Sequence, residues 1–454
     1  MMGRLFGTDG IRGEAGKYPL DASTIEKIGF SLASRMGVKA RIVIGRDTRE
    51  SGQWMESAIR RGIERAGAEA LSAGVITTPG VAFLARELGA TAGVVISASH
   101  NPYHDNGIKI FSATGRKLSD EMELAIESDL AQPAPADSSE GASQNQPEAE
   151  SAPELTRRYF DYLRDQVAAG LDLTTIPGSS RVKLVLDCAN GAASGIAPKL
   201  FRELGAEVMV INDQPDGRNI NLNCGALHPE KLQQVVVDAG AMVGFAFDGD
   251  ADRLMLVDER GSLLDGDFIL HMMSEYLATR NRLSKGRVVA TVMSNLGLEL
   301  ALRKLEIELV RTSVGDKYVL EELLGGGGSI GGEQSGHIIF PAISLAGDGI
   351  ITAIEILRAV SESGRTVSDL ASGMVRLPQI LINVRVGRKP AFESIPEINE
   401  ALERHQNLLA GEGRILLRYS GTENIARIMI EGRDEATIKL QAEELAGLIA
   451  RHLS

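Results

Sequence analysis

Residues 97–109 bring a serine, a histidine and a lysine together directly after a short apolar segment. The segment 94–96 reads as a strand, and open α/β sheets bind ligands at the carboxyl ends of their strands. Ser99 could act there as a nucleophile, while His100 and Lys109 could transfer a proton. Alone, the pattern also fits a capped strand-to-helix turn. Three further polar loops, each next to an apolar segment, favour the catalytic interpretation.

Three aspartates, Asp248, Asp250 and Asp252, occupy alternate positions after the apolar segment 245–247. Carboxylates held this close repel one another, and a hard divalent cation with oxygen ligands relieves the repulsion. An EF-hand calcium loop fits less well, because Arg253 stands where that loop needs glycine. We therefore expect a catalytic magnesium site, with a solvated acidic turn as the weaker alternative.

Glu333, Ser335 and His337 also occupy alternate positions, just before the apolar segment 338–340. On an extended segment these side chains can face one way, which suits sugar hydroxyls and supplies one group that titrates near neutral pH. The glycines within 326–331 match GxGxxG, but a helix precedes them and a strand follows, the reverse of the dinucleotide-binding context. A nicotinamide cofactor is therefore not expected.

A polar loop near the C-terminus combines guanidinium groups, hydroxyls and a glycine. Its candidate residues are Arg418, Ser420, Gly421, Thr422 and Arg427. Such a set binds a phosphate dianion through charge-assisted hydrogen bonds, although a polar hairpin turn would contain the same residue types. The loop 7–13, which contains Arg12, adds a further arginine-bearing turn near the N-terminus.

The composition is that of an ordinary soluble globular protein. The 454 residues are 43% hydrophobic, enough for large cores, and the formal net charge of −13 argues against a nucleic-acid partner. A local basic pocket for a phosphorylated small molecule is compatible with that charge. Cys188 and Cys224 form no CxxC motif, so inert thiols in a reducing compartment are expected. With no leader and no apolar segment long enough for a bilayer, we predict a cytoplasmic protein without a membrane partner.

Three rounds of alternating strand-like and helix-like segments are followed by a different C-terminal part. The segment 131–153 is rich in Pro, Ser, Gln, Glu and Ala and lacks apolar periodicity, so we interpret it as a flexible linker. We predict an α/β protein of four domains, with three related α/β mixed-sheet domains and a small C-terminal α+β domain. The expected domains are 1–153, including the linker, 154–255, 256–370 and 371–454.

Five motifs together carry a resemblance to a known enzyme superfamily. They are GTDGIRG at 7–13, SASHNPYHDNGIK at 97–109, PDGRNIN at 215–221, CGALHPE at 224–230 and GEQSGH at 332–337. In this order they resemble the α-D-phosphohexomutases, and the resemblance extends from residue 7 to residue 431. Within the superfamily the chain is most similar to the phosphoglucosamine mutase family. The phosphomannomutase and phosphoglucomutase branch typically carries methionine where Gln334 stands.

The resemblance implies an isomerase that interconverts glucosamine 6-phosphate and glucosamine 1-phosphate, for UDP-N-acetylglucosamine and cell-wall precursor synthesis. It implies that Ser99 carries a phosphoryl group, gives it to the sugar, and recovers a phosphate from the other end of the bisphosphorylated intermediate. It also implies that Mg²⁺ is bound by the Ser99 phosphate with Asp248, Asp250 and Asp252. The expected partner is a sugar phosphate, and a homodimer is retained as the candidate assembly.

Further residues take part in substrate binding by the same resemblance. The non-reacting phosphate would contact Arg418, Ser420, Gly421, Thr422 and Arg427, and the sugar hydroxyls would contact Glu333 and Ser335. Because phosphoryl transfer depends on charge neutralisation, Arg12 and Arg253 are expected to act electrostatically. Lys109 and His337 are the candidate general base and acid, and His100 would support the serine loop.

Three alternative functions are kept open. A haloacid-dehalogenase-type phosphotransferase could use Asp248 as its nucleophile, but it leaves Ser99 and the GEQSGH motif without a role. A non-catalytic sugar-phosphate-binding regulator would need Ser99 only as a hydrogen-bonding group, and the three alternating carboxylates argue against it. The third alternative is a phosphomannomutase or phosphoglucomutase.

Overall fold

The computed structural model describes residues 4–7, 9–37, 39–131, 152–174, 182–409, 411–420 and 424–454. The chain divides into two compact units, one made of residues 1–293 and 307–372 and the other of 294–306 and 373–454. The predicted linker over 131–153 lies almost wholly outside the described residues.

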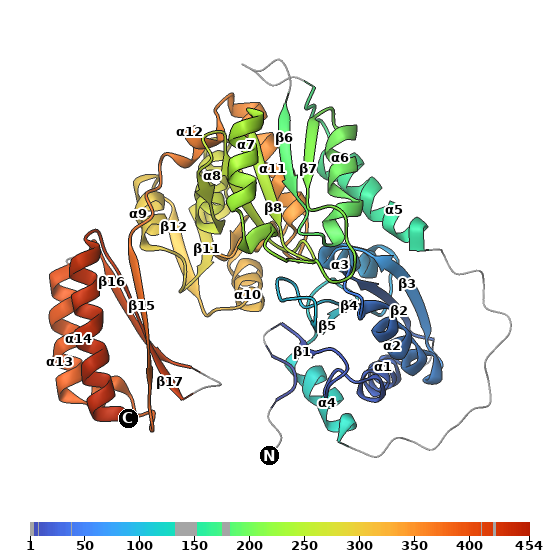
Figure 1. The fold of residues 1–454 in the computed structure, drawn as a ribbon, viewed down its shortest axis with the longest axis horizontal. Coiled ribbons are helices and arrows are strands. Elements are labelled where there is room, and N and C mark those ends of the chain that lie inside the picture. The colour runs from blue at the N-terminus through green and yellow to red at the C-terminus, as the bar shows by residue number, and fades with distance from the viewer. Residues whose placement is uncertain are drawn as a thin grey trace. The chain divides into compact units, whose positions relative to one another are not determined.

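The first unit contains three sheets (Figure 1). The first sheet has the order β1-β5-β4-β2-β3, from β1 (Ile11–Glu14), β2 (Arg41–Arg46), β3 (Glu69–Val75), β4 (Ala92–Ile96) and β5 (Asp105–Ser112). The second has the order β10-β9-β8-β6-β7, from β6 (Lys183–Asp187), β7 (Glu207–Ile211), β8 (Val243–Phe247), β9 (Leu254–Asp258) and β10 (Leu263–Leu264). The third has the order β12-β11-β13-β14, from β11 (Arg287–Thr291), β12 (Glu308–Thr312), β13 (Gly331–Gly332) and β14 (Ile338–Ile339). Four strands of each sheet follow one order, and in the described part of the chain the third sheet has no counterpart of the outer strands β1 and β10.

In each sheet, three parallel strands are joined by an antiparallel strand next to the last of them. These antiparallel pairs are β4 with β5, β8 with β9, and β13 with β14. The repetition confirms the prediction of three related α/β mixed-sheet domains. We call each of these sheets, with its helices, the first, second and third module in chain order.

Helices cover the sheets of the three modules. They are α1 (Ala22–Met36), α2 (Gly52–Arg65), α3 (Thr78–Glu87), α4 (Asp120–Leu130), α5 (Ala152–Tyr162), α6 (Ala197–Glu203), α7 (Glu230–Ala239), α8 (Gly266–Thr279), α10 (Asp316–Gly326), α11 (Gly349–Ser363) and α12 (Val367–Ala371). Shorter helical segments are η1 (Leu163–Val167), η2 (Ala192–Gly195), η3 (Gly225–Leu227) and η4 (Ser284–Gly286). All of β4 is buried, as expected of a strand that is covered on both faces. Among the described residues, no helix combines the length and the hydropathy that crossing a bilayer requires.

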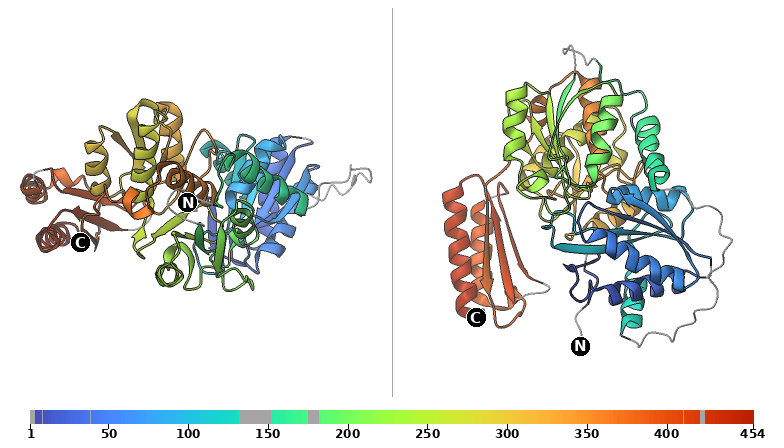
Figure 2. Two further views of the ribbon diagram at one scale, coloured as in Figure 1. Left: turned by 90° about the horizontal axis from the view of Figure 1, so that it is seen from above. Right: turned by 45° about the vertical axis from the view of Figure 1, so that its right-hand side comes forward.

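The C-terminal unit is a small α+β structure, as predicted. Its antiparallel sheet has the order β15-β17-β16, and the unit contains α9 (Leu296–Lys304), β15 (Gln379–Arg385), η5 (Phe392–Ser394), α13 (Pro396–Leu409), β16 (Arg414–Tyr419), β17 (Ile425–Glu431) and α14 (Glu435–Leu453). Figure 2 shows α13 and α14 side by side on one face of this sheet, where Ile428, Ile430 and Leu445 belong to one buried cluster.

Residues 294–306 group with the C-terminal unit by their contacts. Within that unit, Asn295 Nδ2 lies 3.0 Å from both Leu377 O and Glu431 Oε1. The predicted domain bounds, including the assignment of this segment to the domain 256–370, stay a proposal.

The three modules place their polar loops at equivalent positions. The loop 97–104 joins β4 to β5, the loop 248–253 joins β8 to β9, and the loop 333–337 joins β13 to β14. Each loop therefore leaves the last parallel strand and enters its antiparallel neighbour. The three chemistry-bearing segments found in the sequence are thus the same connection, repeated once in each module.

We predict that Gly62→Ala destabilises the first module. A Cβ at this position would lie 1.9 Å from Glu26 O, because α1 and α2 cross backbone against backbone there. Relieving that clash by moving a helix should cost about 1–3 kcal/mol. The measurement is the thermal unfolding midpoint of the full chain. Gly325→Ala is the control, since Gly325 lies in α10 with no atom near its Cβ position, and its midpoint should stay equal or rise. Equal midpoints for the wild type and Gly62→Ala would contradict the packing described.

Candidate active site

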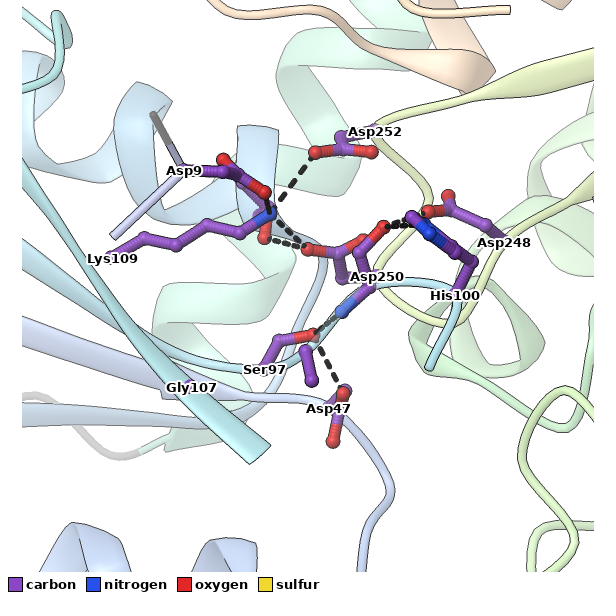
Figure 3. Close-up of polar contacts among 12 residues, drawn as sticks. Asp9, Asp47, Ser97, His100, Gly107, Lys109, Asp248, Asp250 and Asp252 are labelled. Carbon is purple, nitrogen blue, oxygen red and sulfur yellow. Dashed lines mark hydrogen bonds and ion pairs between the residues drawn. The ribbon is translucent and has the colours of Figure 1, made fainter. Parts of the chain in front are cut away.

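The serine loop is held in a strained turn by side chains around it. Ser99 is fully buried and has a φ of 52°, in the left-handed region that non-glycine residues rarely adopt. Its backbone N–H donates to Ser97 Oγ at 2.9 Å, and Ser97 Oγ donates to Asp47 Oδ2 at 2.6 Å (Figure 3). Strain of this kind persists only where surrounding contacts over-determine the backbone, and it is common at functional sites.

Two further residues bind the carbonyl groups of the serine loop. The fully buried guanidinium of Arg49 donates to Ser99 O at 3.0 Å, to Asn101 O at 2.8 Å and to Asp105 O at 3.0 Å. Asn221, from the second module, donates its Nδ2 to Ser99 O at 2.8 Å and to Asn101 O at 3.1 Å. The turn is therefore fixed from both the first and the second module.

The serine loop and the aspartate loop meet face to face. Ser99 Oγ donates to Asp248 Oδ2 at 2.5 Å, and His100 Nδ1 lies 3.2 Å from the same hydroxyl. A Cβ on Gly249 would lie 2.6 Å from Ser99 O, so only glycine permits this approach of the two backbones. The hydroxyl predicted to carry chemistry and the predicted metal ligands thus belong to one site.

The three aspartates form a buried cluster with ligand oxygens within 4.8 Å of one another. Lys109 Nζ lies beside them, 2.9 Å from Asp250 Oδ2 and 3.1 Å from Asp252 Oδ2 (Figure 3). Thr78 Oγ1 also donates to Asp250 Oδ2, at 2.5 Å. The opposite oxygens, Asp250 Oδ1 and Asp252 Oδ1, have no hydrogen-bond partner among the described residues. Buried carboxylate oxygens without a donor indicate that the cluster can hold a cation.

The titration of these carboxylates is strongly perturbed. Burial, with the charges of Asp252 and Asp250, raises the pKa of Asp248 well above its ordinary value. Burial acts in the same direction on Asp252, but Lys109 and His337 outweigh it and hold the pKa of Asp252 well below its usual range. Burial opposes the charge on Lys109, yet its carboxylate neighbours raise the pKa of Lys109 well above the ordinary lysine value.

The two histidines of the site are shifted in opposite directions. Burial, together with Arg253 and Arg12, lowers the pKa of His100 to about 4, so this imidazole is neutral near pH 7. Burial opposes the charge of His337, but Asp252 and Asp316 raise its pKa to about 9. His337 Nδ1 lies 3.8 Å from Asp252 Oδ2, and its Nε2 lies 3.7 Å from Asp316 Oδ2. Neutral and protonated imidazoles therefore stand on either side of the aspartates.

A cavity of about 460 Å³ opens beside this cluster. Its lining includes Asp9, Arg12, Asp252, Arg253, Glu333 and His337. The Arg12 guanidinium pairs with Asp9 and donates to Ala98 O at 3.4 Å, which ties the cavity wall to the serine loop. Ser99 itself lies behind this wall and does not line the cavity. The cavity therefore combines two cations with hydrogen-bonding groups suited to a phosphorylated sugar.

The GEQSGH loop lines the cavity only in part. Glu333 lines the cavity, and its Oε1 accepts from Gly315 N at 3.1 Å. Ser335 does not line it, and Ser335 Oγ is buried without a hydrogen-bond partner among the described residues. Of the three residues expected to face one way, Glu333 and His337 therefore share the cavity and Ser335 does not.

The C-terminal unit carries two of the predicted phosphate-binding arginines on neighbouring strands. Arg418 of β16 and Arg427 of β17 are direct cross-strand partners, and burial together with the Arg427 charge lowers the pKa of Arg418. Like charges placed opposite one another are unfavourable unless an anion binds between them. Ser420 O accepts from Lys389 Nζ at 2.8 Å, which adds a third cation. Gly421 and Thr422 lie outside the described residues.

Several residues that hold the site escaped prediction. Asp9 stands in the loop 7–13, and Asp47 and Arg49 stand in a second arginine-bearing loop, 45–49. No pattern in the sequence shows that Arg49 is buried against carbonyls. Lys117 and Asp316 form an ion pair of 2.7 Å between modules, which no local spacing could reveal. Asn221, which also holds the serine loop, is the last residue of the motif PDGRNIN. That motif is the sequence signal that could have pointed to it.

Comparison with known proteins adds four family models and many relatives. The models describe the phosphoglucomutase/phosphomannomutase alpha/beta/alpha domains I, II and III and the C-terminal domain, and they match residues 3–136, 157–261, 265–377 and 381–448. The chain is 45% identical over 460 residues to a phosphoglucosamine mutase of Syntrophus aciditrophicus, with 100% of both chains covered. It is 47% identical to a phosphoglucosamine mutase of Moorella thermoacetica, covering 99% of this chain and 98% of that one.

Solved structures share the fold. A phosphoglucomutase/phosphomannomutase family protein from Burkholderia thailandensis superimposes with a TM-score of 0.78 at 23% identity, covering 100% of this chain and 99% of the other. An Aspergillus fumigatus N-acetylphosphoglucosamine mutase in complex with GlcNAc-6P and magnesium gives a TM-score of 0.66 at 18% identity, covering 99% and 96%. At such identities the likeness is one of fold.

We predict that His337 makes the metal-free protein lose stability as the pH rises. Its pKa of about 9 in the folded chain lies above the ordinary 6.5, so the stabilisation is complete below about pH 6.5 and is lost as the pH rises through 9. The contribution should reach about 3 kcal/mol. In chelator, the difference in thermal midpoint between the wild type and His337→Asn should be large near pH 6 and close to zero above about pH 9.5. The exposed His104→Asn is the control, and a difference for His337→Asn that does not depend on pH would contradict the assignment.

Proposed function

Because the chain belongs to the phosphoglucomutase/phosphomannomutase family, we propose that it interconverts glucosamine 6-phosphate and glucosamine 1-phosphate. It is an isomerase, and relatives of the same length that are 45–47% identical carry the name phosphoglucosamine mutase. This assignment rules out the haloacid-dehalogenase-type phosphotransferase and the non-catalytic regulator. The 1-phosphate product would serve UDP-N-acetylglucosamine and cell-wall precursor synthesis.

One observation carries the proposal at the level of chemistry: Ser99 Oγ lies 2.5 Å from Asp248 Oδ2, where the loops of two modules meet. Phosphorylation of Ser99 would replace its hydroxyl proton with a phosphoryl group. The phosphate dianion would then face buried carboxylates. Such an arrangement is stable only when cations neutralise it. Lys109 already contacts these carboxylates, and Arg12 and Arg253 line the adjacent cavity.

The aspartate cluster fits a divalent cation. Its ligand oxygens converge, and two buried oxygens, Asp250 Oδ1 and Asp252 Oδ1, have no donor among the described residues. We propose Mg²⁺ as this cation, held by Asp248, Asp250 and Asp252 with an oxygen of the Ser99 phosphate. When bound, the ion supplies positive charge for the phosphoryl group in transfer.

The remaining site residues would bind the sugar and move protons. We propose that His337, protonated near pH 7, acts as the general acid and that Lys109 acts as the general base once the cation neutralises its carboxylate partners. His100, a neutral imidazole 3.2 Å from Ser99 Oγ, would support the serine. Arg12 and Arg253 would stabilise the charge that develops on the transferred group.

Two groups of residues would recognise the substrate. In the cavity, Glu333 would accept a hydrogen bond from a sugar hydroxyl, and Ser335 of the same loop, which does not line the cavity in this structure, is the proposed second contact. The non-reacting phosphate would bind to the C-terminal loop through Arg418 and Arg427, with Ser420, Gly421 and Thr422. The opposed guanidinium groups support this, since an anion between them relieves their repulsion.

The proposal also covers location and assembly. We propose a cytoplasmic enzyme, supported by two buried free cysteines, Cys188 and Cys224, in the described part of the chain. A homodimer is the proposed assembly, and sedimentation of the purified chain tests it.

The metal proposal predicts that a chelator abolishes turnover and that Mg²⁺ restores it. Asp250→Asn removes one anionic ligand, so the Kd for Mg²⁺, measured by titration calorimetry, should rise at least about 10-fold. Asp238→Asn is the matched control, because Asp238 is an exposed carboxylate of the same module. Full turnover in excess chelator would contradict the metal site.

The substrate proposal predicts a higher kcat/KM for glucosamine 6-phosphate than for glucose 6-phosphate or mannose 6-phosphate. These sugars share their phosphate and most hydroxyls, so the discrimination arises at the second carbon, where an amide such as that of Gln334 could favour the amino group. Steady-state rates under matched conditions give the ratio. A higher value for glucose or mannose 6-phosphate would leave the family assignment intact and overturn the choice of substrate.

A further inference from the structure

Two ion pairs connect the first module to the third beside the cavity. Lys117 Nζ lies 2.7 Å from Asp9 Oδ1 and 2.7 Å from Asp316 Oδ1. Lys317 Nζ lies 2.9 Å from Asp120 Oδ2. The first module thus contributes the cation Lys117 and the anion Asp120, and the third contributes the anion Asp316 and the cation Lys317. We call Lys117, Asp120, Asp316 and Lys317 the clamp; sliding one module along the other would bring like charges together.

The clamp is connected to the groups proposed to bind the sugar and to transfer a proton. Asp316 Oδ2 lies 3.7 Å from His337 Nε2, and the neighbouring Gly315 N donates to Glu333 Oε1 at 3.1 Å. On the other side, Asp9 also pairs with Arg12. A change in the distance between the two modules would therefore move the proposed sugar-binding residues away from the serine loop.

The clamp lines a second cavity, next to the substrate cavity. The substrate cavity of about 460 Å³ and a second cavity of about 380 Å³ share four lining residues, Asp9, Asp252, Asp316 and His337. Lys117 and Lys317 line only the second cavity. The Lys117 side chain therefore faces the second cavity and not the substrate cavity.

The two pairs of the clamp differ in strength. The side chains of Lys117 and Asp316 are 17% and 19% exposed, whereas Asp120 is 56% exposed. Burial works to lower the pKa of Lys117, but Asp316 and Asp9 together raise it, so the side chain remains an ammonium ion. Removing that ammonium would leave Asp316 with His337 Nε2, at 3.7 Å, as its one ion-pair partner among the described residues, while Asp9 would keep Arg12 and Lys109. The Lys117 bridge is therefore the stronger connection and the exposed pair the weaker one.

We propose that Lys117 is a positioning residue that keeps the first and third modules together between the two phosphoryl transfers, so that the bisphosphorylated sugar is not released. This inference rests on the proposed function. In the first transfer, O1 of glucosamine 6-phosphate bonds to phosphorus, the Ser99 Oγ–P bond breaks, and the O1 proton is replaced by one on Oγ. In the second, Ser99 Oγ gives up that proton and bonds to the phosphorus of the 6-phosphate, the O6–P bond breaks, and O6 takes up a proton. Escape between the two steps leaves an unphosphorylated enzyme.

The test is a single-turnover experiment with phosphorylated enzyme and glucosamine 6-phosphate. The reaction is quenched, free glucosamine 1,6-bisphosphate is quantified, and the phosphorylated fraction of the protein is measured by intact mass spectrometry. In Lys117→Met the bisphosphate released per turnover should rise at least about 10-fold, with a matching loss of phosphoenzyme. Lys317→Met should raise release measurably but less, by about 2- to 5-fold, because its pair is exposed. Lys117→Arg keeps the charge and should restore most of the retention.

Lys17→Met is the matched control, since Lys17 pairs with Glu14 at 2.7 Å on the exposed surface of the same module. A folded Lys117→Met with wild-type release, even at a lower thermal midpoint, would show a merely structural lysine and overturn the proposal. If Lys117→Met does not fold, Lys317→Met decides, because increased release supports the clamp and unchanged release overturns it. A wild-type phosphoenzyme that transfers nothing to glucosamine 6-phosphate would instead refute the proposed function.

Discussion

Repulsion among buried carboxylates is the constraint on which this site depends. Asp248, Asp250 and Asp252 are buried, and their ligand oxygens lie within 4.8 Å of one another. Breaking a buried ion pair by removing its cation costs about 3–5 kcal/mol, so such a cluster exists only while cations offset it. Lys109 of the first module supplies one such cation to the aspartates of the second module. The charge balance of the site therefore depends on residues from both modules. A phosphoryl group on Ser99 would add negative charge and so increase the need for a metal ion.

Repetition of one sheet explains how the chain brings these groups together. The serine loop, the aspartate loop and the GEQSGH loop are the same strand connection in three modules. In the proposed function each module supplies one part of the site from an equivalent position: a phosphoryl carrier, a cation site and a sugar-binding edge. Backbone contact between Gly249 and Ser99 joins the first two loops, and the Lys117 bridge joins the first module to the third. The modules are thereby connected beside the site while each keeps its own buried cluster.

The sequence predicted the fold class, and it pointed to the residues that we propose carry chemistry, because both leave local signals. Alternate aspartates after an apolar strand, or Ser-His before Asn-Pro, can be read within a few positions. Arg49 and Asn221 could not be assigned to the serine turn in that way, since they contact carbonyls far along the chain. The opposite pKa shifts of His100 and His337 could not be predicted from the sequence either, because burial and charges from several loops produce them. The contacts of Asn295 with Leu377 and Glu431 are equally remote from any local pattern.

Transfer of the phosphoryl group from Ser99 to the sugar tests the account most directly. The enzyme is labelled on the serine with radioactive phosphate, freed of excess label and mixed with unlabelled glucosamine 6-phosphate for one turnover. Label on the C1 oxygen of the product, equal in amount to the label lost from the peptide containing Ser99, is the predicted result. Label that stays on the protein while product forms, or label found on an aspartate instead of Ser99, would contradict the central claim.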